Sequence, residues 1–503
     1  MSMKWYLLCL LFLPLSMTGQ TIPIGWIDNS FGINGSDTIN DVIPDLLSVF
    51  KGDSLISVGA AAIGGVIVAK FDNNGYPCAN FGTNGSLHFN IPGYGNSFTQ
   101  SATVQPDGRI LIAGYGIGDT TLNDFLIVRL MPDGSFDTSF NKTGILAADF
   151  DQLDNDLWNI GLQPDGKILA CGTTSTDTGL RLELVRFRNN GAIDSTFGTA
   201  GRAGLILGGN SGPMYMARQP DGKIVVGGGW GGASNAVSVL MRFDSTGTLD
   251  STFGIHGQNI TPTPNTWIFS LQLLPSGKFL TSDGIGFARY NANGNPDSTF
   301  GTNGVVNPNV ALTNVSVPCS VAPTPDGKTV YTITEEVGGV AKEILARFNS
   351  DGSPDTTFGT EGIIVNLVPE IKTYKNYVDA VQVQSSGKIV TSGFVQTHIG
   401  DGLGVLTRYF QTSTGVPSIT GNFDQLTLYP NPAQHDVTIV SSILRGNVLL
   451  HILDMNGKIV QSQDLQFQNG SVSFHTDIAP GVYGLQLSDE IGQLKTAKLV
   501  IER

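Results

Sequence analysis

The sequence ARQPDGKIVVGGGWGGASNAVSVLMRFDSTGTLDSTFG, residues 217–254, contains the unit from which most of the chain is built. Its Pro-Asp-Gly turn at 220–222 reverses the chain, because proline presets φ and glycine accepts a left-handed conformation. The apolar run at 223–226 is too short for a helix and is typical of a strand covered on both faces. A glycine-rich stretch around Trp230, which we interpret as a loop, leads to a second predicted strand over 237–243. The unit therefore alternates strand and turn signals.

Three markers of this unit recur in step along the chain, and each indicates seven copies. They are the turn glycine, a phenylalanine that usually follows an aspartate by three residues, and a cation followed by an apolar or aromatic residue. The glycines are Gly52, Gly108, Gly166, Gly222, Gly277, Gly327 and Gly387; the phenylalanines are Phe31, Phe81, Phe140, Phe197, Phe253, Phe300 and Phe358; the cations are Lys70, Arg129, Arg186, Arg242, Arg289, Arg347 and Arg408. The glycines lie 50 to 60 residues apart.

A period of this length with about four strand signals per copy predicts an all-β fold of propeller blades. The last copy ends at Arg408-Tyr409 without an Asp-x-x-Phe-Gly segment, whereas Asp28 to Gly32 precedes the first complete copy. We expect the N-terminal segment to complete the last blade and close a seven-bladed β-propeller over 22–410, because closure removes unpaired strand edges. A β-solenoid or a string of small sandwiches is the alternative.

The repeats resemble the bacterial delta-60 repeat family, whose members carry PDGK-type turns followed by an aromatic-rich D-x-x-FG segment. The resemblance covers residues 26–409. The first copy departs most, with Gly52-Asp53 in place of the Asp-Gly turn and Cys78 where other copies have aspartate. The resemblance implies a repeat scaffold and assigns no biochemical activity.

The character of the chain changes after Phe410. Residues 411–425 form a polar linker that contains Gly, Ser, Thr and Pro, and the repeat markers end there. Residues 426–503 then show about seven short strand-like segments separated by turn signals. This size and turn spacing predict a small antiparallel β-sandwich.

This last segment resembles the type A C-terminal sorting domain of the type IX secretion system. The resemblance rests on the motifs LYPNP at 428–432, DMNGK at 454–458, APGVY at 479–483 and KLV at 498–500. The residues that carry the implied sorting signal are Tyr429, Pro430, Asn431, Pro432, Gly457, Gly481 and Lys498. The resemblance implies Sec export, passage across the outer membrane with the type IX machinery as partner, and a secreted or surface-attached product.

The N-terminus reads as a signal peptide over residues 1–19. Lys4 precedes an apolar run at 5–13, and small residues lead to Gly19-Gln20. The run is too short to span a bilayer, so no transmembrane segment is predicted. The chain after cleavage keeps Cys78, Cys171 and Cys319, an odd number at different places in the repeat, and we therefore expect free, buried thiols.

Motifs for catalysis or metal binding are not found in the sequence. The formal net charge of −14 is spread without basic runs, so a nucleic-acid groove is not expected. The six histidines show no HExxH, HxH or other paired spacing, and no metal or cofactor is predicted. Segments 244–250 and 349–355 share a few features with calcium loops but lack the remaining ligands, so we interpret them as Asx-stabilised turns. Residues required in every copy, above all the Arg and Asp markers, are predicted to be structural.

Function is expected in the parts that differ between copies. These are the predicted loops at 114–124, 173–179, 228–236, 335–342 and 393–404. Tyr115 and Trp230 are the candidate binding residues, as aromatic platforms for a glycan or protein ligand. The sequence favours a binding scaffold without catalytic residues, and the competing interpretation is a secreted propeller hydrolase or lyase acting on polysaccharide.

Overall fold

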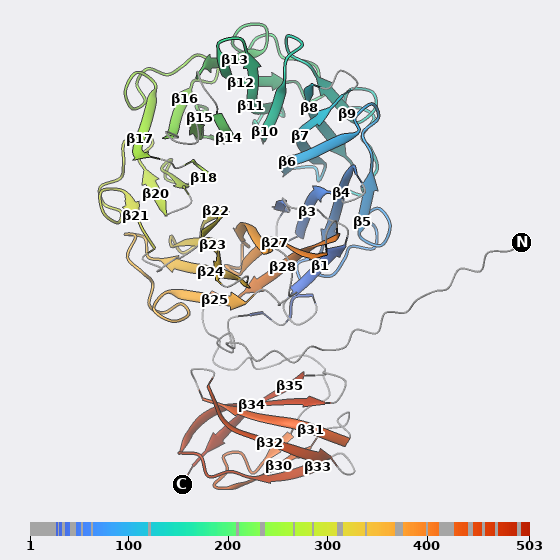
Figure 1. The fold of residues 1–503 in the computed structure, drawn as a ribbon, viewed down its shortest axis with the longest axis vertical. Helices are drawn as coiled ribbons and strands as arrows, with labels where there is room; N and C mark the ends of the chain where they lie inside the picture. Colours follow the sequence, from blue (N-terminus) through green and yellow to red (C-terminus); the bar gives the residue numbers. More distant parts are fainter. Residues whose placement is uncertain are drawn as a thin grey trace, which may run out of the picture. The chain divides into compact units, whose positions relative to one another are not determined.

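The computed structural model describes residues 27–502 except 29, 33–35, 41–46, 52–53, 62–63, 119–121, 208–210, 232–236, 265–266, 284–285, 309–314, 338–339, 368–375, 399–400, 412–426, 441–445, 455–457, 468–470 and 490–493. All regular elements in these residues are β-strands (Figure 1). One compact unit spans Ile27–Thr412, and a second contains the described residues 427–502. The predicted signal peptide lies outside the described residues, as does the predicted linker beyond Gln411.

The described residues of the unit Ile27–Thr412 form seven four-stranded antiparallel sheets. The sheets follow one another around a ring, with one edge strand of each sheet nearest the centre (Figure 1). The first three are β2 (Leu47–Lys51), β3 (Ser54–Ala60), β4 (Val66–Phe71), β5 (Ser86–Phe89); β6 (Asn96–Val104), β7 (Ile110–Ile117), β8 (Asn123–Leu130), β9 (Ile145–Ala148); and β10 (Asn155–Leu162), β11 (Ile168–Thr176), β12 (Gly179–Phe187), β13 (Arg202–Ile206).

The next three sheets follow the same order. They are β14 (Ser211–Arg218), β15 (Ile224–Trp230), β16 (Val237–Phe243), β17 (Gln258–Pro264); β18 (Ser270–Leu273), β19 (Phe279–Ser282), β20 (Phe287–Tyr290), β21 (Val305–Val306); and β22 (Val315–Pro323), β23 (Thr329–Val337), β24 (Val340–Phe348), β25 (Ile363–Leu367). The prediction of an all-β chain of propeller repeats is confirmed.

The seventh sheet joins the two ends of the unit, as the complementary repeat fragments predict. Its order is β1 (Ser36–Asn40), β28 (Asp401–Tyr409), β27 (Ile389–His398) and β26 (Asn376–Val383), with Ser36 opposite Thr407 in the register of β1 and β28. Phe31 is fully buried in a cluster that combines Leu55 of the first sheet with Leu406 of the last. The N-terminal segment therefore closes the ring.

In six of the seven sheets the repeated Arg and Asp residues form a cluster with the Lys or Arg of the first turn, and the third sheet shows the pattern. Arg186 Nε lies 2.9 Å from Asp194 Oδ2, and Lys167 Nζ of the PDGK turn lies 3.3 Å from the same oxygen. The Arg186 guanidinium stacks on the Phe197 ring at 4.7 Å, and its Nη1 donates a 2.9 Å hydrogen bond to the carbonyl of Ser245 in the next sheet. The cluster thus binds one sheet internally and also ties it to its neighbour.

The contact to the next sheet recurs around the whole ring. Each donor is a cation at the end of a third strand, and each acceptor is a backbone carbonyl just after the third strand of the following sheet. The pairs are Lys70–Pro132, Arg129–Asn189, Arg186–Ser245, Arg242–Ala292, Arg289–Ser350, Arg347–Gln411 and Arg408–Asn73. The last pair joins the seventh sheet to the first, so the series is closed.

Glycine is required in the turns that receive these contacts. Gly294 has φ of +88°, and a Cβ there would come within 2.6 Å of the Phe253 ring of the preceding sheet. Gly247 is in the same position against Phe197, with a closest approach of 3.0 Å. The Phe marker and the glycine of the turn after the third strand of the next sheet therefore form one packing contact between neighbouring sheets.

The first sheet lacks the ion pair, as its divergent sequence suggests. Lys70 replaces the arginine, and Cys78 stands where the other sheets have aspartate. The backbone geometry is nevertheless kept, because the Cys78 N–H donates to the Lys70 carbonyl at 2.8 Å. Cys171 and Cys319 are buried while Cys78 is half-buried, and none of the three forms a disulfide. The prediction of buried thiols therefore fails for Cys78, which lies at the edge of its sheet.

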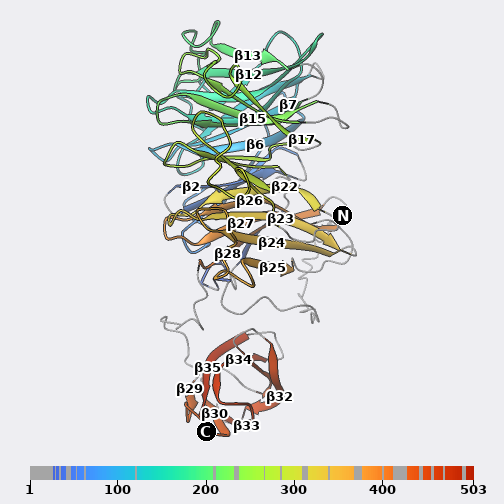
Figure 2. The same ribbon diagram turned by 90° about the vertical axis from the view of Figure 1, so that its left-hand side faces the viewer.

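The described residues of the C-terminal unit form two antiparallel sheets. One has the order β29 (Thr427–Tyr429), β30 (Asp436–Val440), β33 (Ser471–His475); the other has β32 (Ile459–Phe467), β31 (Gly446–Leu453), β34 (Gly481–Asp489), β35 (Leu494–Ile501). The strands curve around a common core (Figure 2). That core includes Val437, Leu450, Leu485 and Leu499, which alternate with outward-facing positions as in a strand covered on one face.

Candidate functional site

The ring has two chemically different faces. Because neighbouring strands are antiparallel, the turns after the first and third strands of a sheet lie at one end, and the connection between its second and third strands lies at the other. We call the first end the turn face, with the turns at 219–222 and 244–247 as examples, and the second the hairpin face, with the β7–β8 connection as example. Figure 2 shows the ring edge-on, with strand ends at both faces.

The turn face carries the repeated polar groups, and these groups bind one another. Asp194 illustrates the electrostatics: burial acts to raise its pKa, but hydrogen bonds from Thr196 and Lys167 and the charge of Arg186 outweigh burial and lower the pKa to about 2. The predicted Asx turn at 244–250 is confirmed, since Asp244 Oδ1 accepts the backbone N–H of Thr246 at 2.8 Å. These residues are structural.

The segments predicted as loops on the hairpin face are mostly strands, which corrects the sequence interpretation. The range 173–179 is a hairpin in which Thr176 of β11 pairs with Gly179 of β12. Trp230 lies in β15, where its backbone is opposite Ser211 and Val237, and its side chain lies outside the described residues. The glycine-rich run is a strand, and position 229 needs glycine because a Cβ there would come within 2.4 Å of the Trp267 ring.

Tyr115 is half-buried in β7 and contacts an aromatic residue that sequence reasoning missed. Its ring lies 5.5 Å from that of Trp158, at an interplanar angle of 65°. Trp158 sits at a bulge in β10, between the pairs Leu157–Gly172 and Asn159–Cys171, and its Nε1 donates to Thr173 Oγ1 at 3.2 Å. A bulge re-aims the side chain of the unpaired residue.

A signal for Trp158 exists in the repeats. It lies eight residues before the turn glycine, and the corresponding positions in other copies are Pro44, Gln100, Met214, Phe269, Cys319 and Asp379. No two of these are alike, in contrast to the constant Arg, Asp and Phe markers. A site that occurs only once in the ring must use positions whose residues differ between copies, and the position of Trp158 is one of these.

A polar cluster lies beside the aromatic pair. The Asn123 side chain donates to Asp156 Oδ1 at 2.8 Å, and its backbone N–H donates to Asp154 Oδ1 at 3.0 Å. Burial raises the pKa of the Asp156 carboxyl, and the charge of Asp154 raises it further against the opposing hydrogen bond from Asn123. On the other side of the β7–β8 hairpin, Tyr94 Oη donates to Asp124 Oδ2 at 2.5 Å.

The aromatic pair and the polar cluster lie at the same interface, between the second and the third sheet. Tyr115 is opposite Phe125 and Ile117 is opposite Asn123, so Tyr115 and Asn123 project to the same side of the second sheet. We name Tyr115, Trp158, Asn123 and Asp156 the β7–β10 cluster. Aromatic rings beside carboxylate and amide groups can stack on an apolar ring face and accept or donate hydrogen bonds at its rim.

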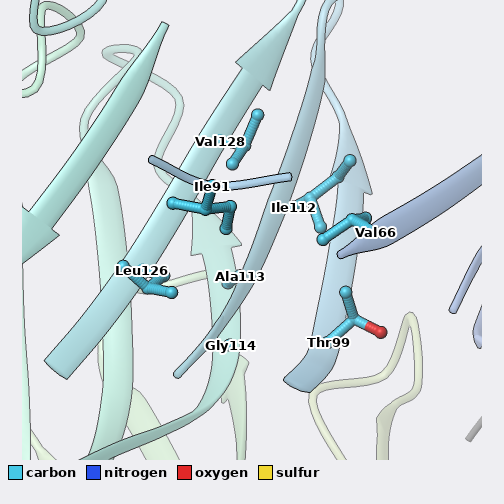
Figure 3. A pocket seen from close by; sticks show the side chains of 8 residues that line it. All are labelled: Val66, Ile91, Thr99, Ile112, Ala113, Gly114, Leu126 and Val128. Carbon is cyan, nitrogen blue, oxygen red and sulfur yellow. The ribbon is translucent and has the colours of Figure 1, made fainter. Parts of the chain in front are cut away.

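A small cavity near the hairpin face is too small to be the site. Its volume is about 10 Å³, which is room for at most one water molecule. Figure 3 shows its lining, which is apolar apart from Thr99. Thr99 Oγ1 is buried and lacks a hydrogen-bond partner among the described residues. This cavity therefore cannot hold a glycan or another ligand larger than water.

The first sorting motif pairs with the end of the chain. Its residues, all exposed, are Tyr429, Pro430, Asn431 and Pro432. Asn431 Oδ1 accepts the backbone N–H of Val500 at 2.8 Å, and the N–H of the following Ala433 donates to the Val500 carbonyl, also at 2.8 Å. The motif at 428–432 and the motif at 498–500 are therefore neighbours in space.

The third motif lies at the same edge. Gly481 begins β34 and pairs with Ile501, and the backbone of Lys498 pairs with Gly484. The Lys498 side chain and all of Gly457 lie outside the described residues. The motifs at 428–432, 479–483 and 498–500 thus lie close together, where β34 and β35 adjoin the first described residues of the unit.

Metal-ligating side chains gather in one place within the described part of the chain. They are His435, His475 and Asp477 of the C-terminal unit. The sequence showed no paired spacing among the histidines because the pairing of β30 with β33 brings these residues together. No helix among the described residues is long and apolar enough to cross a membrane.

Several solved structures resemble this chain distantly. PorZ, a surface component of the type IX secretion system of Porphyromonas gingivalis, matches with 12% identity and a TM-score of 0.40, over 91% of this chain and 59% of PorZ. This chain thus spans about three fifths of the length of PorZ. A protein of unknown function from Bacteroides caccae has 14% identity and a TM-score of 0.37, over 64% of this chain and all of that one. A putative exo-β-1,3-galactanase from Bifidobacterium bifidum has 10% identity and a TM-score of 0.30, over 59% and 89%.

Family models match both units, whereas a search of curated proteins finds no match. A model described as a domain of unknown function (DUF5122) β-propeller matches residues 105–140, 163–197, 219–253, 276–300 and 324–358. A secretion system C-terminal sorting domain matches residues 427–502. The chain thus contains five matched DUF5122 β-propeller repeats and a type IX C-terminal sorting domain, which indicates a secreted or outer-surface location.

Proposed function

We propose that the propeller binds an extracellular glycan at the β7–β10 cluster on its hairpin face. The supporting observation is the contact of Tyr115 with Trp158 beside the hydrogen-bonded pair of Asn123 and Asp156. All four side chains are partly exposed, and none belongs to the repeated markers. Sugars offer both a weakly polar ring face and a rim of hydroxyl groups, so they match aromatic and carboxylate neighbours.

Binding without catalysis agrees with how the charged groups are used. The repeated Asp and Arg side chains neutralise one another on the turn face, as in the pair of Arg347 and Asp355 at 2.7 Å. A residue that serves the same contact in sheet after sheet is poorly suited to form one unique site. A protein ligand remains the second class of partner, and it would use the same face.

Replacing Tyr115 by alanine is expected to weaken glycan binding by about 1 to 2 kcal/mol, roughly 5- to 30-fold, because an aromatic contact at the site is lost. Tyr115→Phe keeps the ring and should bind nearly as wild type. The measurement is a glycan array with the purified protein, followed by calorimetry on the best ligand. Tyr76→Ala removes an exposed aromatic residue in the 72–76 turn and serves as the control. Unchanged binding by a folded Tyr115→Ala protein contradicts the proposal.

Trp230 remains a proposed second contact on this face. Trp230→Ala should weaken binding by about 1 kcal/mol or more while leaving the melting temperature nearly unchanged, as expected of a residue that contacts the ligand and not the core. The glycan array measures the binding of the Trp230→Ala protein, and a thermal melt measures its melting temperature. A large loss of thermal stability with full binding would assign Trp230 to the core.

The alternative function is a polysaccharide hydrolase or lyase, and one observation favours it. Asp154 and Asp156 both accept hydrogen bonds from Asn123, and the raised pKa of Asp156 suits a general acid. A screen of polysaccharides for cleavage, run with wild type and Asp156→Asn, separates the classes. Cleavage that depends on Asp156 would replace the binding proposal.

Export is proposed to depend on the C-terminal unit. A truncated protein that ends at Asn422 should fold as the unit Ile27–Thr412 and remain in the periplasm of the native host, because the matched sorting domain at 427–502 is missing. Immunoblots of periplasmic and extracellular fractions test this. Normal amounts of the truncated protein outside the cell would exclude the sorting role.

A further inference from the structure

The surface of the C-terminal unit brings together three side chains that can ligate a metal ion. Asp436 is the register partner of His475 in β30 and β33, and the N–H of Thr476 donates to the His435 carbonyl at 2.8 Å. This pairing sets the two histidine rings nearly parallel, 5.6 Å apart at 10°. Asp477 follows directly after Thr476, so a carboxylate joins the two rings.

The ligand atoms converge on one point. His435 Nδ1 lies 3.0 Å from Asp477 Oδ1, and His475 Nε2 lies 3.4 Å from Asp477 Oδ2. The ligand atoms of the three residues all lie within 4.8 Å of one another. A tetrahedral zinc ion with bonds of about 2.0 to 2.2 Å needs ligands about 3.4 Å apart. Rotations of these exposed side chains are enough to close the difference.

A fourth residue orients one of the ligands. His475 Nδ1 lies 2.8 Å from Asp436 Oδ1. A neutral imidazole carries one N–H and one lone pair, so donation to Asp436 leaves the Nε2 lone pair facing the Asp477 carboxylate. Two electron-rich atoms then face each other, an arrangement that a cation between them stabilises. Metal-ligating histidines commonly donate their other N–H to a carboxylate in this way.

We propose that His435, His475 and Asp477 bind one zinc ion, with Asp436 as the positioning residue for His475. The ion joins the residue before β30 to the last residue of β33 and the segment just after it, and so holds this edge of the unit together. Two imidazole nitrogens select zinc over calcium and magnesium, which prefer oxygen ligands. The remaining coordination position is open to water, because His475 and Asp477 are exposed and His435 is only partly buried.

The test is calorimetric titration of zinc chloride into the untagged full chain at neutral pH. We expect one zinc ion per chain and no heat with calcium chloride. His435→Gln and His475→Gln should each weaken binding at least tenfold, and Asp436→Asn should weaken it about 10- to 100-fold. His256→Gln, in the other unit, is the control and should bind as wild type.

Cobalt substitution distinguishes a metal site from a merely structural cluster. The cobalt-loaded wild type should show visible absorption, and His475→Gln should lose it. Zinc binding that survives the double change His435→Gln and His475→Gln, or a folded wild type that binds no zinc, overturns the proposal. Should the histidine variants fail to fold, Asp436→Asn decides, because the Asp436 side chain is 82% exposed; unchanged zinc affinity in that variant overturns the positioning role and with it the site.

Discussion

Phe31→Ala is expected to lower the free energy of unfolding by about 3 to 5 kcal/mol, as truncation of a core aromatic residue does. Phe31 is fully buried, the Arg408 guanidinium stacks on its ring at 4.7 Å, and a Cβ at Gly75 would come within 2.8 Å of it. The residue therefore fills the contact between the last sheet and the first. The measurement is the urea midpoint of the purified protein.

Tyr76→Ala is the matched control for this prediction. Tyr76 is 54% exposed, and its truncation should change stability by no more than about 0.5 kcal/mol. A Phe31→Ala protein that unfolds at the same urea concentration as wild type would mean that the N-terminal segment does not complete the seventh sheet.

Asp194→Asn is expected to cost about 3 to 5 kcal/mol at neutral pH, because it leaves the buried Arg186 guanidinium without its counter-charge. Arg186 and Asp194 are almost fully buried, and Lys167 shares the same carboxylate. Asp165→Asn removes an exposed partner of Lys167 and should cost only about 0.2 to 1 kcal/mol. Urea midpoints of the three proteins at neutral pH measure the difference.

The same pair predicts a pH dependence. The folded-state pKa of Asp194 is about 2, below its ordinary value of 3.8, so its stabilising contribution is fully present above the ordinary value. It is lost as the pH falls through about 2, because the carboxylate is then protonated in the folded state as well. The stability difference between wild type and Asp194→Asn should therefore be constant above about pH 5 and narrow between pH 4 and pH 2. A stability difference that stays the same between pH 4 and pH 2 would contradict a stabilising role for the charge of Asp194.

The ring and its closure could be predicted from the sequence because they follow from the number and spacing of the repeat markers. The segment at 28–32 supplies the Asp-x-x-Phe-Gly sequence that the last copy lacks. In the structure, Arg408 Nη2 lies 2.7 Å from Asp28 Oδ2. The structural role of the repeated charges followed from their repetition. The repeat pattern did not show that each arginine also binds the following sheet. The acceptor is a backbone carbonyl, which every residue has, so no residue type in the sequence indicates it.

The candidate sites were harder to predict because they depend on register. Trp158 reaches Tyr115 only through the bulge in β10, and His435 meets His475 only through the pairing of β30 with β33. The composition of the glycine-rich run around Trp230 predicts a loop, because a glycine needed for close approach to Trp267 looks the same in the sequence as one needed for a turn. Local composition does not distinguish these cases.

Disulfide trapping between β1 and β28 tests the closed ring most directly. Ser36 and Thr407 are register partners whose Oγ atoms lie 3.2 Å apart, and opposite residues in an antiparallel pair meet the distance needs of a disulfide. Cys78 is changed to Ser in the background so that no partly exposed native thiol competes, and Ser36→Cys with Thr246→Cys is the control pair. The account predicts that Ser36→Cys with Thr407→Cys gives a cross-linked peptide under non-reducing mass spectrometry, whereas the control pair does not. Two free, alkylatable thiols at positions 36 and 407 in the folded protein would contradict it.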